Sequence, residues 1–78
     1  MKRAVGVDEL SDAELRIFAN AVDHGRAASP SGVMHSAPIR DETGRLCEVR
    51  FYEDSARQQP FAVVRITPDG TMLPLEPL

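Results

Sequence analysis

Three residues carry side chains that could act as nucleophile, base or metal ligand: Cys47, His24 and His35. A cysteine attacks as the thiolate, so it needs a histidine or another cation beside it. The strand pattern around Cys47 places its thiol on the core face, where a cysteine usually behaves as a small inert hydrophobic residue. His24 falls at the negative end of a predicted helix, and His35 falls in a predicted loop. We therefore expect no catalytic dyad.

Metal and phosphate sites have no better support in the sequence. Two distant histidines and one buried cysteine are not a cluster of zinc ligands. The stretch SPSG at residues 29–32 lacks the lysine of a phosphate-binding loop. The acidic pairs at 41–42 and 53–54 lie in predicted turns, where carboxylates are normally hydrated. The sequence predicts no enzyme, no cofactor and no metal.

Length and composition describe one small domain over residues 1–78. A chain of 78 residues has material for a single core. It carries a net charge of −3, with 42% hydrophobic and 27% charged residues, and no basic or acidic block. The lone Cys47 cannot form an intrachain disulfide, and no apolar run reaches the length of a membrane span. We expect a cytoplasmic protein that does not enter a membrane. All but one of its 9 basic residues are arginine, a bias that we associate with bacterial or phage genomes.

The strongest local pattern predicts a helix over residues 12–24. Ser11 and Glu14 have the spacing of a capping box, in which each side chain accepts the backbone N–H of the other residue. Gly25 is predicted to end the helix, since glycine readily adopts the left-handed conformation. The face that packs on the core is predicted to hold Leu15, Phe18, Ala19 and Val22.

Residues 26–37 show no sustained hydrophobic periodicity and are expected to form a loop. Period-two patterning then predicts strands at 37–40, 45–53, 60–66 and 71–75, separated by turns such as TPDG at 67–70. Hairpin connections make this sheet an antiparallel meander. One face of it must cover the apolar stripe of the helix. The predicted fold is therefore a two-layer α+β domain in which one N-terminal helix packs on a four-stranded antiparallel meander, in the order α-β-β-β-β.

The two central strands have apolar residues on both faces. In the strand at 45–53 the core face is predicted to hold Cys47, Val49 and Phe51, and the outer face to hold Leu46, Glu48, Arg50 and Tyr52. In the strand at 60–66 the polar Arg65 is expected to point outward, and every second side chain from it should point the same way. Its inner face is then predicted to hold Ala62, Val64 and Ile66, and its outer face Phe61, Val63 and Arg65.

The outer face is our candidate partner-binding surface. Aromatic residues beside arginine and glutamate are typical of interface cores. The partner-binding residues are predicted to be Leu46, Tyr52, Phe61, Val63, Arg50 and Arg65, together with Ile17 on the helix. Ile17 lies between Ala13 and Ala21 on a second face directed away from the core stripe, which would let two helices of a homodimer approach closely.

The sequence allows two other interpretations of the outer face. Exposed apolar residues are common on any folded surface, and the C-terminal segment MLPLEPL could fold back over the sheet and cover the patch. A shift of register by one residue at Phe61 would exchange the two faces of its strand.

We expect a non-catalytic protein-interaction module: a small cytoplasmic adaptor, accessory subunit or phage-type inhibitor whose partner is a larger protein or a second copy of this chain. The alternative is a single-stranded nucleic-acid-binding protein that stacks bases on Tyr52 and Phe61 beside Arg50 and Arg65. The net negative charge argues against nucleic acid, because such proteins surround their aromatic residues with positive charge.

Overall fold

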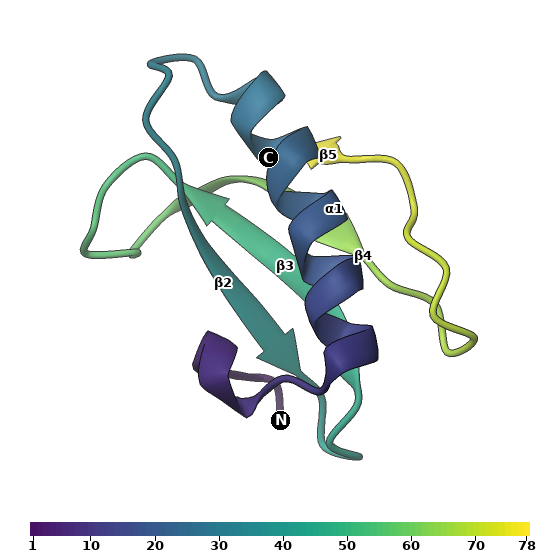
Figure 1. The fold of residues 1–78 in the computed structure, drawn as a ribbon. Helices are drawn as coiled ribbons and strands as arrows, with labels where there is room; N and C mark the ends of the chain where they lie inside the picture. Colours follow the sequence, from purple (N-terminus) through teal and green to yellow (C-terminus); the bar gives the residue numbers. More distant parts are fainter.

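A computed structural model describes all residues from 1 to 78. It has one helix packed on an antiparallel five-stranded sheet, in the spatial order β1-β2-β3-β4-β5. The elements along the chain are β1 (Arg3–Ala4), the short 3-10 helix η1 (Val7–Glu9), α1 (Asp12–Ala28), β2 (His35–Arg40), β3 (Leu46–Tyr52), β4 (Pro60–Arg65) and β5 (Glu76–Pro77). Helix α1 crosses one face of the sheet, over β3 and β4 (Figure 1). The predicted two-layer α+β meander is confirmed, with the two-residue strand β1 added at its start.

The helix begins as predicted but ends later. Ser11 Oγ accepts the Glu14 N–H at 3.2 Å, and Glu14 Oε1 accepts the Ser11 N–H at 2.9 Å, so the capping box is formed. Gly25 does not end the helix, which continues to Ala28. A Cβ atom at Gly25 would lie 2.4 Å from ring carbons of Phe51. The glycine therefore serves the close approach of the helix to β3, and not a left-handed cap.

The buried face of α1 is rotated from the predicted one. Ala21 is fully buried at the centre of the contact, whereas Ala19 is exposed. Ile17 is half-buried and packs against the helix-side core. The expectation that Ile17 and Ala21 face away from the core is therefore wrong. The small residues at 21 and 25 lie one helical turn apart, so they let α1 come close to the sheet.

A first register shift, between Ile39 and Arg40, places Leu46 and Cys47 on the opposite faces of the sheet from those predicted. Arg40 pairs with Leu46 and Ile39 pairs with Glu48, which leaves Cys47 as an extra residue. Such a bulge breaks the alternation of faces. Leu46 consequently joins the helix-side core, and Cys47 joins a cluster with Ile39 on the outer face. The predicted faces of Leu46 and Cys47 were wrong for this reason.

A second shift, between Phe51 and Tyr52, redirects Phe61. Phe51 pairs with Ala62 and Tyr52 pairs with Pro60, so Phe61 is the extra residue. Phe61 packs against the helix-side core, with its ring centroid 6.4 Å from that of Phe51. Its predicted outward position was wrong. The inward positions of Ala62, Val64 and Ile66 are confirmed by their place in the helix-side core.

The C-terminal segment pairs with β4 as the edge strand β5 (Figure 1), and its Met72 and Leu75 pack against the helix-side core instead of on the outer face. The Thr67–Gly70 turn forms as predicted, with the Gly70 N–H donating to the Thr67 carbonyl at 2.9 Å and Gly70 at φ 87°. The expected strand at 71–75 is reduced to one bridge between Ile66 and Met72, and pairing resumes only at β5. Pro74 cannot donate a backbone hydrogen bond, which interrupts the ladder.

Candidate interaction surface

The outer face of the sheet, opposite α1, contains an apolar layer that the protein itself covers. Ile39, Val63 and Tyr52 keep only 1%, 2% and 6% of their surface exposed. Cross-strand pairing places Val63 beside Arg50 of β3 and beside Glu76 of β5. Because long charged side chains can lie along apolar surface with their heads in water, such residues exclude solvent from this layer.

Glu48 is the centre of the charged cover. Its carboxylate accepts hydrogen bonds from Lys2 Nζ at 2.6 Å and from Arg50 Nε at 2.8 Å. The Glu48 side chain is only 6% exposed, whereas those of Lys2 and Arg50 are 47% and 35% exposed. Burial raises the pKa of Glu48, but the two cations outweigh it and hold the pKa below its usual value. The buried carboxylate thus stays ionised and fixes both cations over the sheet.

Solvent therefore meets three cations on this face, together with the carboxylate of Glu76. Arg65 adds a third cation, half-exposed and 3.4 Å from the carboxylate of Glu76 at the sheet edge. We call Lys2, Arg50 and Arg65 the outer-face cations. Glu48 is hidden beneath two of them, so these accessible cations stand out on a chain whose net charge is −3.

The structure separates the predicted partner-binding residues into two groups. Arg50, Arg65, Tyr52 and Val63 lie on the outer face, but only the two arginines are accessible. The other three pack with the helix-side core: Leu46, Phe61 and Ile17. Lys2 was missed, because nothing local to the first residues indicates that they reach the outward-facing Glu48.

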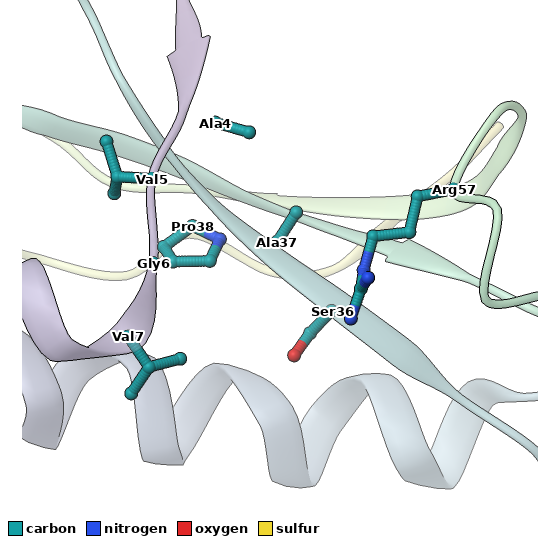
Figure 2. A pocket seen from close by; sticks show the side chains of 8 residues that line it. All are labelled: Ala4, Val5, Gly6, Val7, Ser36, Ala37, Pro38 and Arg57. Carbon is teal, nitrogen blue, oxygen red and sulfur yellow. The ribbon is translucent and has the colours of Figure 1, made fainter.

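A pocket of about 300 Å³ lies at the edge of β2, where β1 leaves the sheet (Figure 2). The Val5 N–H donates to the Pro38 carbonyl at 3.0 Å. Pro38 has no N–H to return the bond, so pairing stops there and the chain turns away at Gly6 toward η1. The pocket is lined by Ala4, Val5, Gly6, Val7, Ser36, Ala37, Pro38 and Arg57.

Arg57 extends from the β3–β4 connection toward Ser36 (Figure 2). It has a left-handed backbone, with φ 52°, and its N–H donates to Asp54 Oδ1 at 3.0 Å. Its exposed guanidinium forms no ion pair within the chain. The pocket thus combines a wall that is half hydrophobic residues with one positive charge that has no ion-pair partner.

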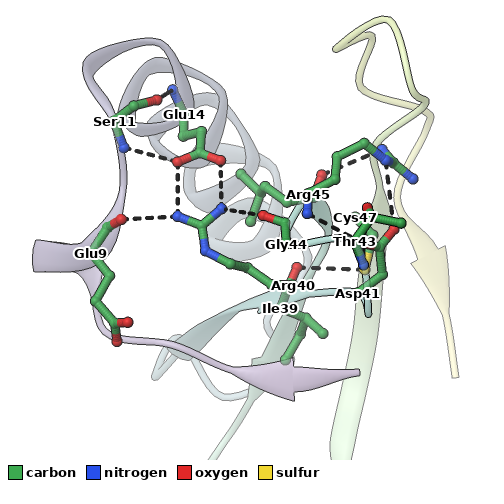
Figure 3. A network of polar contacts seen from close by, with 11 residues as sticks. Glu9, Ser11, Glu14, Ile39, Arg40, Asp41, Thr43, Gly44, Arg45 and Cys47 are labelled. Atoms are coloured by element: carbon green, nitrogen blue, oxygen red, sulfur yellow. Dashed lines mark hydrogen bonds and ion pairs between the residues drawn. The ribbon is translucent and has the colours of Figure 1, made fainter. Parts of the chain in front are cut away.

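A separate polar network joins the start of α1 to the end of β2 (Figure 3). The Arg40 guanidinium donates two hydrogen bonds to the Glu14 carboxylate, at 2.7 and 3.0 Å, and one each to the carbonyls of Glu9 and Gly44, both at 2.9 Å. Hydrogen bonds from Arg40 and from the Ser11 backbone lower the pKa of Glu14 to about 2. Because all these groups satisfy one another, the network is structural.

Glu14→Gln should destabilise the protein in a pH-dependent manner. The folded-state pKa of Glu14 lies below its ordinary value of 4.5. The stabilisation by ionised Glu14 is therefore fully present above about pH 4.5 and is lost as the pH falls toward about 2. We expect the variant to lose about 1–2 kcal/mol in urea unfolding at pH 7 and much less at pH 2. Glu53→Gln, in an exposed turn, is the control. An equal loss for Glu14→Gln at both pH values would contradict the charge-assisted pair.

The three residues considered for chemistry lie on different elements: His24 is exposed on α1, Cys47 is in β3, and His35 is the first residue of β2 and not part of the predicted loop. Cys47 is buried, its Sγ donates to the Ile39 carbonyl at 3.5 Å, and burial raises the pKa of its thiol. No group of three or more His, Cys, Asp and Glu side chains is placed to hold a metal ion. No helix is long and apolar enough to cross a membrane.

In comparisons with protein-family models, with curated proteins and with solved structures, the chain matches none. The fold and its surfaces define a small two-layer α+β domain with a cation-bearing sheet face and an open strand edge.

Proposed function

We propose that this protein is a non-catalytic interaction module that binds an acidic surface of a larger protein through its outer-face cations. The proposal is supported above all by the arrangement around Glu48. A buried carboxylate holds Lys2 and Arg50 in place, so their charged heads are ordered before any partner arrives. Ordering side chains in advance reduces the entropic cost of association. We place this module in the cytoplasm, as an adaptor, accessory subunit or inhibitor.

The expected partner surface is acidic because of charge complementarity. Complementary charges speed encounter and fix the orientation of a complex. The apolar residues beneath the cations are buried within the monomer, so they contribute rigidity and little contact area. A homodimer through Ile17 has no support, since Ile17 packs on the protein's own core.

Nucleic acid also carries negative charge, but base stacking needs accessible aromatic faces. Tyr52 is buried, and Phe61 lies on the helix side of the sheet. The observations therefore favour a protein partner.

Arg65→Glu should abolish most partner binding without unfolding the protein. Arg65 is half-exposed, so charge reversal leaves the core intact while it opposes an acidic partner. We expect affinity-tagged protein to capture a partner from its source cells, and the purified partner to bind the variant about tenfold more weakly in calorimetry.

Arg16→Glu is the matched control, because Arg16 is an exposed arginine on α1, away from the outer face. Equal weakening by both variants would show that only net charge matters, and would contradict a site on the outer face. Nuclease-sensitive capture that fades steeply with added salt would favour nucleic acid instead.

A further inference from the structure

The pocket-side edge of β2 is only partly covered. Strand β1 pairs with Arg40 and Ile39, and Val5 donates to the carbonyl of Pro38, after which the first strand departs. In an antiparallel strand, alternate residues direct both backbone groups to the same edge. Ser36 therefore directs its N–H and C=O toward the edge that β1 has left. Figure 2 shows this residue at the pocket, beside Ala37.

The two outer edges of the sheet are protected against addition of another strand, whereas residues 35–37 of β2 lack this protection. Strands β1 and β5 have two residues each, and prolines at 74 and 77 limit pairing along the C-terminal edge. Short edge strands and prolines prevent unwanted strand addition. The open stretch at residues 35–37 has no proline of its own, since Pro38 lies at its far end, where β1 already pairs.

The groups around this edge fit an extended, acidic segment. The apolar side chains of Val5, Val7 and Pro38 offer a surface to a small aliphatic residue. Arg57 offers a guanidinium that no carboxylate of the chain occupies, since Asp54 instead accepts the Arg57 backbone N–H. A volume of about 300 Å³ is at the low end for small-molecule pockets and suits one side chain of a bound segment.

We propose that the open edge of β2 binds an extended peptide segment of the partner by strand addition at Ser36, with a carboxylate side chain of that segment on Arg57. This inference rests on the proposed function, because it names the part of the partner that the protein contacts. Backbone hydrogen bonds supply affinity in this mode of recognition, and side-chain contacts supply specificity. The Gly6 turn limits the paired stretch to about three residues, so the isolated contact is weak.

The test uses a capped pentapeptide, acetyl-Thr-Val-Glu-Val-Thr-amide, added to the isotope-labelled protein and followed by amide NMR. We expect shifts at the amides of Ser36, Ala37 and Gly6 and at the Arg57 Nε–H, saturating at millimolar peptide. The same peptide with Gln in place of Glu should bind about fivefold more weakly, as should the Glu peptide to Arg57→Gln. Arg16→Gln is the matched control and should bind as the parent does.

A peptide N-methylated at its backbone tests the strand addition itself. Methylation at the residue opposite Ser36 should abolish the shifts, because it removes one of the paired donors. Unchanged binding by the methylated peptide, equal binding by the Glu and Gln peptides, or no shift at residues 35–37 would each overturn the inference. The same shifts with sodium acetate alone would also overturn it, by showing a site for small carboxylates only.

The two proposals fail separately. If the peptide does not bind while Arg65→Glu still weakens partner binding, the strand-addition site is wrong and the outer-face proposal stands. If the peptide binds as expected while Arg65→Glu has no effect on the partner, the outer-face site is wrong and the edge site stands.

Discussion

Val63→Asp should unfold most of the protein at room temperature. Val63 is 2% exposed on the outer face, so the new carboxylate would enter a dry layer. Arg50 lies opposite it across the strands but already donates to Glu48, so the new carboxylate would compete with Glu48 for this one guanidinium. We expect a loss of about 3 kcal/mol or more, most of the stability of so small a domain. Circular dichroism during urea unfolding measures it.

Val33→Asp is the matched control for this variant. Val33 is 52% exposed in the connection before β2, so the same substitution there should change stability by less than about 0.5 kcal/mol. A folded Val63→Asp protein with an unchanged unfolding midpoint would show that the outer face is not covered by its charged side chains. It would also restore an exposed apolar patch as the candidate contact.

Gly25→Ala should destabilise the protein, although alanine is the better helix former. In an exposed helix interior this substitution stabilises by about 1 kcal/mol. Here the added Cβ would lie 2.4 Å from ring carbons of Phe51, which is fully buried and has no space to retreat. Overpacking of this kind costs about 1–3 kcal/mol, and such a short contact belongs at the upper end. We expect a net loss of about 2 kcal/mol in urea unfolding.

A double-mutant cycle assigns that loss to one contact. Phe51→Leu removes the ring and is itself destabilising, but Gly25→Ala should then cost little or become favourable in its background. Equal costs of Gly25→Ala in both backgrounds would contradict the steric explanation. They would favour a role of Gly25 in ending the helix, which is the role that its position in the sequence suggests.

The outer face and the pocket are the two parts of the sheet that no helix or strand of the chain covers completely. Charged side chains fixed by Glu48 keep an apolar layer dry, so the face opposite α1 needs no second helix. Proline in β2 ends the pairing with β1 and leaves a short edge open beside Arg57. Both surfaces offer positive charge, which is the reason that we propose acidic partners for them.

The sequence by itself determined the elements whose cause is local. The capping box at Ser11 and Glu14 depends on residues three positions apart, and the turn at 67–70 depends on Pro68 and Gly70. These interactions form within a few residues of chain, so their pattern is sufficient to predict them. The antiparallel meander and its covering helix followed from the same local patterns together with short connections.

Only the tertiary structure decided which face several residues occupy. The bulges at Cys47 and Phe61 depend on how neighbouring strands align, and a single extra residue reverses the alternation on which the sequence argument relied. The role of Gly25 depends on Phe51, 26 positions away along the chain, and the charged cover depends on Lys2 reaching Glu48. Strand alternation was sufficient to predict Arg50 and Arg65 on the outer face, but the complete charged cover was beyond local patterns, because Lys2 reaches Glu48 from 46 positions away along the chain.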